Sequence, residues 1–324
     1  MRVVRLKALR RILAVAVLLG AACAASAQGY PSRAVKFVVP FPPGALPDQI
    51  ARVLGRELQD SLAQPFVIEN RPGAIGVVGT AESARAAPDG YTIVMTTNST
   101  MAAAPSLFKN LQYDPLRDFT PIALVGTTSM ILLVRPDFPA QTLKDFISYA
   151  RAQNGKLTAG YGSAGSQVSI AKLKAGGGFG AIDVPYKGVP LAVTDVLSGQ
   201  IAFTFADFAV GLGQAKGGKL KALGVTSASR TPLAPEIPAI GEEIPGYEIV
   251  LWYGIVAPAG TPREAISKLY LAIAAAMEKS DFKARFAAWG VDPAPLGPEQ
   301  FAGYMKSEIA KWSRDIRQAG IQPE

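Results

Sequence analysis

The stretch VKFVVPFPPGALPD, residues 35–48, indicates most about the fold of this 324-residue chain. Residues 35–39 are mainly apolar and β-branched and stop at Pro40, which predicts a short buried strand. A proline-rich loop follows, and Asp48 stands where a helical pattern of apolar residues begins: Ile50, Val53, Leu54, Leu58 and Leu62. The stretch therefore predicts a strand, a stiff loop and a helix in direct succession.

The same alternation continues along the chain. Short apolar runs predict further strands at residues 65–69, 91–96, 122–125, 130–134, 157–161, 182–184, 201–205 and 220–225. Helical spacing predicts helices at 75–86, 143–153 and 189–198, and two more near the end of the chain, one opened by a capping box at 261–264 and one with an apolar stripe over 301–316. This order predicts an α/β fold with a largely parallel sheet covered on both faces.

The composition excludes several kinds of chemistry. The chain contains no histidine and one cysteine, so Ser-His-Asp and Cys-His catalysis and histidine-ligated zinc are excluded. Its length suggests two domains. Neither a metal nor a cofactor is expected.

The first 27 residues have the pattern of a secretory signal peptide. Five basic residues and no acidic one precede the apolar run at 12–22, which is too short to span a bilayer, and Ala25-Ser26-Ala27 matches a cleavage site. We expect cleavage after Ala27 and export to the periplasm. A membrane anchor is a weaker alternative, as is lipidation of Cys23, because Gly20 stands where an aliphatic residue is required.

Cleavage would change the charge balance. The whole chain has 33 basic and 25 acidic residues, a net charge of +8, and loss of five basic residues leaves a net charge of +3. No basic block with interleaved aromatic residues remains, so nucleic-acid binding is not expected.

Two strand-to-helix turns could bind an anion. One is the 40–48 loop, and the other is Gly162-Ser163-Ala164-Gly165, with Ser166 expected to start a helix. Facing one another, they would present free N–H groups and helix N-termini to an anion, although both could equally be ordinary turns. Asp48 could either cap its helix or orient the loop through backbone bonds.

Two other motifs are weaker. Ser163 lies in a segment similar to a nucleophile elbow, but Tyr161 replaces the first glycine and no histidine exists to activate the serine. The glycines at 73, 76 and 79 match neither a dinucleotide fingerprint nor a P-loop, and turn or packing roles are expected for them.

Across the chain after residue 27, the motifs resemble those of the Bug-type extracytoplasmic solute receptors, the substrate-binding components of tripartite tricarboxylate transporters. The matching segments, in chain order, are YPSR (30–33), VVPFPPG (38–44), DQIAR (48–52), ENRPGA (69–74), PDGYT (88–92), YDP (113–115), DF (118–119), VPYKG (184–188), APAGTP (257–262) and KW (311–312). Together they cover the chain in order, which makes the resemblance specific.

The resemblance implies a type II-like periplasmic-binding-protein fold with a ligand between two α/β domains. We place the signal peptide at 1–27, the first domain at 28–125 plus 249–324, and the second at 126–248, with crossing strands near 122–134 and 248–256. The resemblance also implies that both turns bind a ligand carboxylate. Carried onto this chain, the ligand-binding residues are Phe41, Gly44, Ala45, Asp48, Ser163, Ala164, Gly165 and Ser166, with Thr97, Asn98 and Asp207 added at strand ends.

The sequence departs from the family pattern in two places. Ala45 stands where a second glycine is usual and adds a methyl group near the expected carboxylate. The stretch after Gly165 is shorter than usual, lacks a histidine-containing helix and carries AGGGFG at 175–180, which predicts a weakened helix and a flexible connection.

The expected function is capture of a small carboxylate and its delivery to a membrane permease by a monomeric receptor without catalytic residues. The scarcity of cations other than Lys187 favours one carboxylate held by the backbone over several held by charge. Two alternatives stay open at this point: a sensor that docks to a kinase ectodomain, and a histidine-independent hydrolase that uses Ser163.

Overall fold

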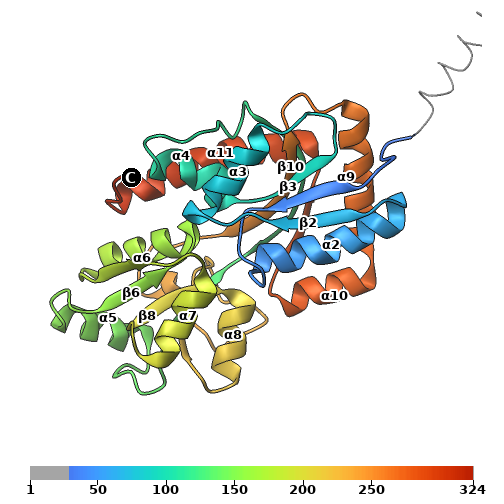
Figure 1. The fold of residues 1–324 in the computed structure, drawn as a ribbon. Helices are drawn as coiled ribbons and strands as arrows, with labels where there is room; N and C mark the ends of the chain where they lie inside the picture. Colours follow the sequence, from blue (N-terminus) through green and yellow to red (C-terminus); the bar gives the residue numbers. More distant parts are fainter. Residues whose placement is uncertain (1–28, 324) are drawn as a thin grey trace, which may run out of the picture.

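The computed structural model describes residues 29–323, and the predicted signal segment lies outside this range. The described chain forms two lobes, each built around its own β-sheet (Figure 1). The six-stranded sheet of the first lobe has the order β11-β4-β10-β3-β1-β2, and the five-stranded sheet of the second lobe has the order β7-β6-β8-β5-β9.

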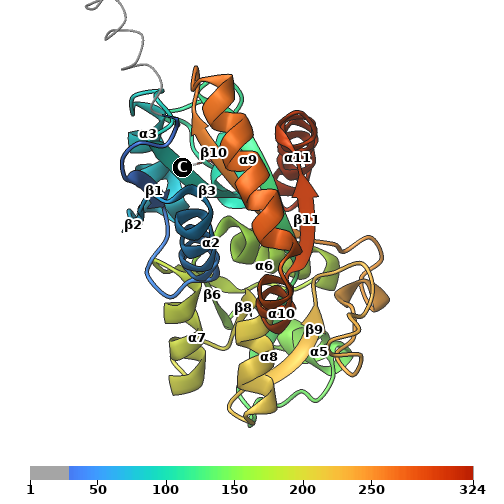
Figure 2. The ribbon, with the colours of Figure 1, turned by 90° about the vertical axis from the view of Figure 1, so that its right-hand side faces the viewer.

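The first-lobe strands are β1 (Val35–Val39), β2 (Phe66–Asn70), β3 (Thr92–Thr97), β4 (Phe119–Thr128), β10 (Leu251–Pro258) and β11 (Asp292–Leu296). Its helices are α2 (Leu46–Leu62), η1 (Ala74–Gly76), α3 (Val77–Ala84), η2 (Ser99–Ala103), α4 (Ala104–Leu107), α9 (Arg263–Glu278), α10 (Ser280–Ala288) and α11 (Pro298–Gln318). Figure 2 shows α2 and α9 side by side on one face of this sheet.

The second-lobe strands are β5 (Met130–Val134), β6 (Thr158–Tyr161), β7 (Ile182–Pro185), β8 (Phe203–Asp207) and β9 (Lys221–Val225). They pack with α5 (Leu143–Ala152), α6 (Ala164–Gly177), α7 (Val189–Ser198), α8 (Phe208–Lys216) and the short η3 (Ile240–Glu242). Because helices cover both sheets, strands such as β5 are buried along their whole length, which explains their continuous apolar sequences.

Side-chain alternation places the strand residues in two hydrophobic clusters. On β1, Phe37 and Val39 pack with α2 and α9, whereas Val38 packs on the opposite face. The cluster that contains Val38 is continuous with the core of the second lobe and also contains Trp252 and Trp312. Their indole N–H groups both donate to Glu308 Oε2 at 3.0 Å, so this buried carboxylate links β10 to α11.

Both sheets are mixed, so the prediction of a largely parallel sheet is only partly right. β1 pairs in parallel with β2 and β3, but β10 runs antiparallel to β3 and β4. In the second lobe, β5 is likewise antiparallel to both its neighbours. The reversed strands are β5 and β10, through which the chain enters each lobe after a crossing, and the edge strand β11, which runs antiparallel to β4.

The chain crosses between the lobes at two adjacent places. Ser129 alone separates β4 from β5, and the return passes through the segment between β9 and β10. These connections are tied together, since Met130 N–H donates to Thr226 Oγ1 at 2.8 Å and Thr226 N–H donates to Met130 O at 2.9 Å. A third link is the ion pair between Lys172 of α6 and Asp315 of α11, 3.4 Å apart.

The helix that the glycine cluster was predicted to weaken forms and extends into that cluster. α6 runs from Ala164 through Gly177, and Gly178 ends it in a left-handed conformation, φ 65°. A side chain at Gly176 would collide with Ile244. The glycines therefore end the helix and permit close packing.

Two other details of the prediction were also wrong or incomplete. The helix expected from the capping box begins at Arg263, and the Thr261 hydroxyl donates to Pro258 O at 2.7 Å instead of capping it. The elements α8, α10 and β11 were not predicted. Within residues 29–323, no helix is both long enough and apolar enough to span a bilayer.

Candidate ligand-binding site

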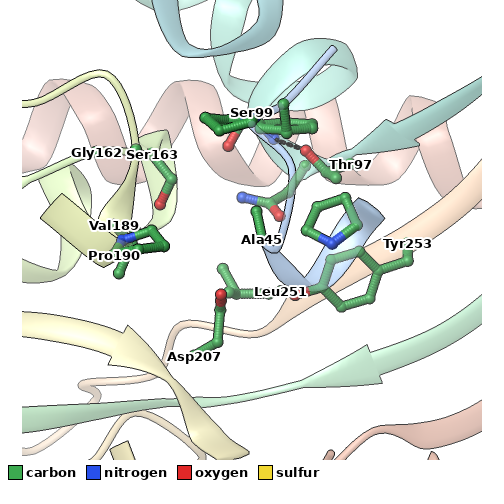
Figure 3. Close-up of a pocket in the computed structure, with 15 residues that line it drawn as sticks. Ala45, Thr97, Ser99, Gly162, Ser163, Val189, Pro190, Asp207, Leu251 and Tyr253 are labelled. Carbon is green, nitrogen blue, oxygen red and sulfur yellow. Dashed lines mark hydrogen bonds between the residues drawn. The ribbon is translucent and has the colours of Figure 1, made fainter. Parts of the chain in front are cut away.

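A narrow cavity lies between the two lobes, where several strands end (Figure 3). We call it the inner cavity, and its volume is about 40 Å³, room for two or three water molecules. Its lining residues come from both lobes: Phe41, Pro42, Ala45, Pro47, Thr97, Asn98, Ser99, Gly162, Ser163, Gly188, Val189, Pro190, Asp207, Leu251 and Tyr253.

The β1–α2 turn is fastened from behind by Asp48. Its carboxylate accepts hydrogen bonds from Gly44 N–H at 2.8 Å, Asn70 Nδ2 at 2.9 Å and Arg52 Nε at 2.9 Å. Burial opposes ionisation of this carboxyl, but the bonds from Arg52, Gly44 and Asn70 outweigh it and lower the pKa of Asp48. Asp48 is thus a charged anchor that holds the loop and Gly44, whose φ is 83°, in place.

The β6–α6 turn is fastened by neutral hydroxyl groups. Ser163 is the N-cap of α6, and its Oγ accepts from Ser166 N–H at 3.2 Å. In return, Ser166 Oγ accepts from the N–H groups of Ser163 and Gly162, both at 3.1 Å. This capping box is complete, so the helix starts two residues earlier than predicted.

These bonds correct the expectation that both turns offer free N–H groups. The amides of Gly44, Gly162, Ser163 and Ser166 bond within their own turns, and Ala45 N–H donates to Pro42 O at 3.2 Å. Ala164 N–H donates across the lobes to Ser99 Oγ at 3.3 Å. Donors for an anion must therefore come chiefly from elsewhere in the cavity.

The end of β3 supplies such a donor. Thr97, Asn98 and Ser99 all line the cavity, and Ser99 N–H donates to Thr97 Oγ1 at 3.1 Å (Figure 3). A π-helical turn, η2, begins at Ser99, a distortion that is frequent at functional sites. The Asn98 side chain is only 2% exposed, and its Nδ2 has no hydrogen-bond partner among the described residues.

Asp207 faces the cavity from the second lobe (Figure 3). It ends β8 and precedes α8, and its carboxyl accepts a hydrogen bond from the Tyr253 hydroxyl of β10. Burial raises the pKa of Asp207 to about 6, although the Tyr253 bond acts in the opposite direction. The cavity therefore combines hydroxyl and amide groups with an acid that titrates near neutral pH.

The structure brings six of the predicted site residues onto the cavity wall: Phe41, Ala45, Thr97, Asn98, Ser163 and Asp207. The other five, Gly44, Asp48, Ala164, Gly165 and Ser166, do not line it and instead shape the two turns. Among the described residues, the side-chain hydrogen-bond partner of Ser163 Oγ is another hydroxyl group, Ser166 Oγ, at 3.2 Å, and not a base.

Sequence reasoning missed several wall residues. Ser99 follows directly after Thr97 and Asn98, so the strand-end argument could have included it. Tyr253 lies beside Thr97 because the two residues pair across β10 and β3, a register that the sequence alone does not reveal. The turn Gly188-Val189-Pro190 reaches the cavity only through the packing of α7.

Comparisons with known proteins agree on one family. The family described as "Tripartite tricarboxylate transporter family receptor" matches residues 50–321. Protein BugT of Bordetella pertussis is 34% identical over 309 residues, covering 94% of each chain. The structure of R. palustris Rpa4515 with adipate has a TM-score of 0.88 and 30% identity, covering 91% of this chain and all of that one. The periplasmic binding protein BugD has a TM-score of 0.86 and 32% identity, with the same coverage.

Proposed function

Because the chain belongs to the tripartite tricarboxylate transporter receptor family, whose members are binding receptors and not enzymes, we propose that the inner cavity holds the carboxylate of its solute. The receptor would deliver that solute to the membrane permease of a tripartite transporter. BugD is a periplasmic binding protein and Rpa4515 carries adipate, and both support a periplasmic carboxylate receptor here.

One observation carries the assignment of the cavity. Asn98 Nδ2 is a buried amide donor that has no partner within the described chain and lies on the wall. A buried unpaired donor carries a desolvation penalty of about 1–3 kcal/mol, which a ligand oxygen would remove. The hydroxyl groups of Thr97 and Ser163 lie on the same wall and offer further donors to that oxygen.

Asn98→Ala tests this assignment. We expect the affinity for carboxylates, measured by isothermal titration calorimetry on protein purified from the periplasm, to fall roughly 10- to 100-fold. Stability without ligand should not fall, because the variant removes an unsatisfied buried group. Asn110→Ala, at an exposed position outside the cavity, is the matched control. Unchanged carboxylate affinity in Asn98→Ala would contradict the proposed site.

Closure of the lobes would give capture its selectivity. Ser99 and Ala164 bond across the cleft, and Lys172 and Asp315 pair beside the crossings. A ligand favours this closed arrangement only as far as it binds it better than the open one. A carboxylate that contacts Asn98 and Ser163 together would do so, since these residues belong to different lobes.

The remaining parts of the proposal concern processing and organisation. We infer cleavage after Ala27, a monomer, and domains at 28–125 with 249–324 and at 126–248. Sheet membership supports this division, although β4 continues to Thr128. Intact-mass measurement and light scattering of periplasmic protein test these points: a mass that begins at Gln28 and belongs to one chain is expected, and a retained leader or a dimer would contradict them.

A further inference from the structure

A second, wider cavity opens from the cleft beside the inner cavity. We call it the outer chamber, and its volume is about 820 Å³. It shares Pro42, Gly188 and Pro190 with the wall of the inner cavity, so the two spaces adjoin. A solute whose carboxylate lies in the inner cavity would extend its remaining atoms into this chamber.

The chamber wall is mainly apolar. Both lobes contribute to it, with Ile75 and Phe108 from the first and Tyr186 and Leu191 from the second. The Tyr186 hydroxyl donates to Asp195 Oδ2 at 2.7 Å, so it already has a partner within the protein. Leu191 is 51% exposed although it is a large aliphatic residue. Such a wall favours an apolar group over a polar one.

The backbone beside the chamber is strained. Ala74 and Ile75 have positive φ values of 45° and 56°, a region that a β-branched residue such as isoleucine rarely adopts. The flanking Gly73 and Gly76 have φ values of 146° and 93°. Strain of this kind persists where the surroundings enforce it and is concentrated at ligand sites. Here the strained backbone places the side chain of Ile75 on the chamber wall.

One cation lines the chamber. Lys187 is exposed and forms no ion pair among residues 29–323, and no acidic side chain lines the chamber. A lysine at the rim of an apolar space favours a ligand that carries a negative group at its far end. Because Lys187 is exposed, this preference should be modest and sensitive to salt.

From these features, and resting on the proposed function, we propose that the solute is a carboxylate with a bulky apolar body of the size of an aromatic ring. This body fills the outer chamber. A second anionic group near Lys187 would increase the affinity further. Short polar acids would occupy the inner cavity alone. They would forgo the apolar contacts with Ile75 and Leu191.

Four ligands separate these possibilities by calorimetry at matched ionic strength: acetate, malate, 3-phenylpropionate and terephthalate. We expect the two ring-containing acids to bind at least about tenfold more tightly than acetate and malate. Terephthalate should gain a further roughly two- to threefold at low salt. If malate binds most tightly, the inference is overturned.

Variants locate the effect. Leu191→Gln and Ile75→Asn should weaken binding of the ring-containing acids by roughly threefold to tenfold and leave acetate unchanged. Asparagine tolerates positive φ better than isoleucine, which should offset part of the packing that Ile75 loses against the hydrophobic core. Lys187→Gln should affect terephthalate only. The controls are Leu271→Gln, at a 65%-exposed leucine of α9, and Lys306→Gln on α11.

The outcomes distinguish the two proposals. If none of the four acids binds, the proposed function fails. If acetate or malate binds most tightly and Asn98→Ala weakens that binding, the proposed function stands and the inference about the chamber fails. Equal losses for all ligands in Leu191→Gln would likewise contradict an apolar role for the chamber.

Discussion

Asp48 and Asp207 occupy comparable places in the two lobes, each where a strand leads into a helix, yet their surroundings differ. Asp48 is buried behind its turn and accepts hydrogen bonds from three residues. Asp207 faces the inner cavity and accepts one, from Tyr253. The pKa of Asp48 is lowered, whereas burial raises the pKa of Asp207 to about 6.

The difference shows how the chain divides structural and ligand-facing roles. A carboxylate with enough donors remains ionised and holds a loop in shape. A carboxylate with one donor beside a cavity carries an unfavourable charge, and such groups cluster where ligands bind. We therefore infer that Asp48 holds the β1–α2 turn in shape and that Asp207 faces the ligand in the inner cavity.

The largest effect is expected from Asp48→Ala. The variant leaves Gly44 N–H and the Asn70 amide without their acceptor and removes the partner of Arg52, so the free energy of unfolding should fall by about 3 kcal/mol at pH 7. Urea unfolding measures this loss. Carboxylate affinity should fall with it, because the turn beside Phe41 and Ala45 loses its anchor.

The pH dependence of Asp48→Asn adds a control. Since the folded-state pKa of Asp48 is lowered, its charge stabilises the protein above the unfolded-state pKa, and this stability is lost as the pH falls through the folded-state value. The difference between wild type and Asp48→Asn should shrink on acidification. A constant difference would mean that the charge is irrelevant.

Asp207→Asn should raise the stability of the protein, whereas Asp48→Ala lowers it. Because the folded-state pKa is raised from 3.8 to about 6, the wild type should lose stability as the pH rises between these values and change little above them. Asparagine can still accept the Tyr253 bond without a buried charge, so the variant should be more stable by about 2–3 kcal/mol at pH 7 and equal to wild type below pH 4. Thermal unfolding at several pH values would measure this, and a less stable variant at pH 7 would contradict it.

The sequence predicts the strand-to-helix alternation well but not these environments. Periodicity locates β1 and α7 with the observed bounds, because each has a clear apolar pattern and ends at a proline or glycine. It cannot reveal that β10 inserts between β3 and β4, since antiparallel pairing joins residues far apart in the chain. For that reason the Tyr253 partner of Asp207 was not foreseen.

The turns were predicted in position but not in hydrogen bonding. A helix N-terminus with serine or aspartate nearby is compatible with free or satisfied amides, and only coordinates decide between them. Asp48 and Ser166 were predicted as ligand contacts; in the structure they fasten the turns and do not line the inner cavity. Asn98 was predicted from its strand-end position, and its unpaired amide became visible only in the structure.

Ser166→Ala tests whether a neutral anchor behaves like the charged one. The hydroxyl accepts from two amides of the β6–α6 turn, so its loss should lower the free energy of unfolding by about 1–2 kcal/mol. Because no charge is involved, this loss should be the same from pH 4 to pH 8. A pH-dependent loss would indicate coupling to Asp207 and would blur the distinction between the two kinds of anchor.

The smallest effect is expected from Arg52→Gln. Arg52 lies 2.9 Å from Asp48, but its side chain is 48% exposed, so water and salt screen the pair. We expect a loss below about 1 kcal/mol that diminishes further at high salt, together with a higher pKa for Asp48. Gly44 and Asn70 would still hold the carboxylate. A loss of stability as large as that of Asp48→Ala would show that the ion pair, and not the set of buried hydrogen bonds, fastens the turn. Asp48 and Asp207 would then differ only in that Asp48 has a charged partner and Asp207 has none.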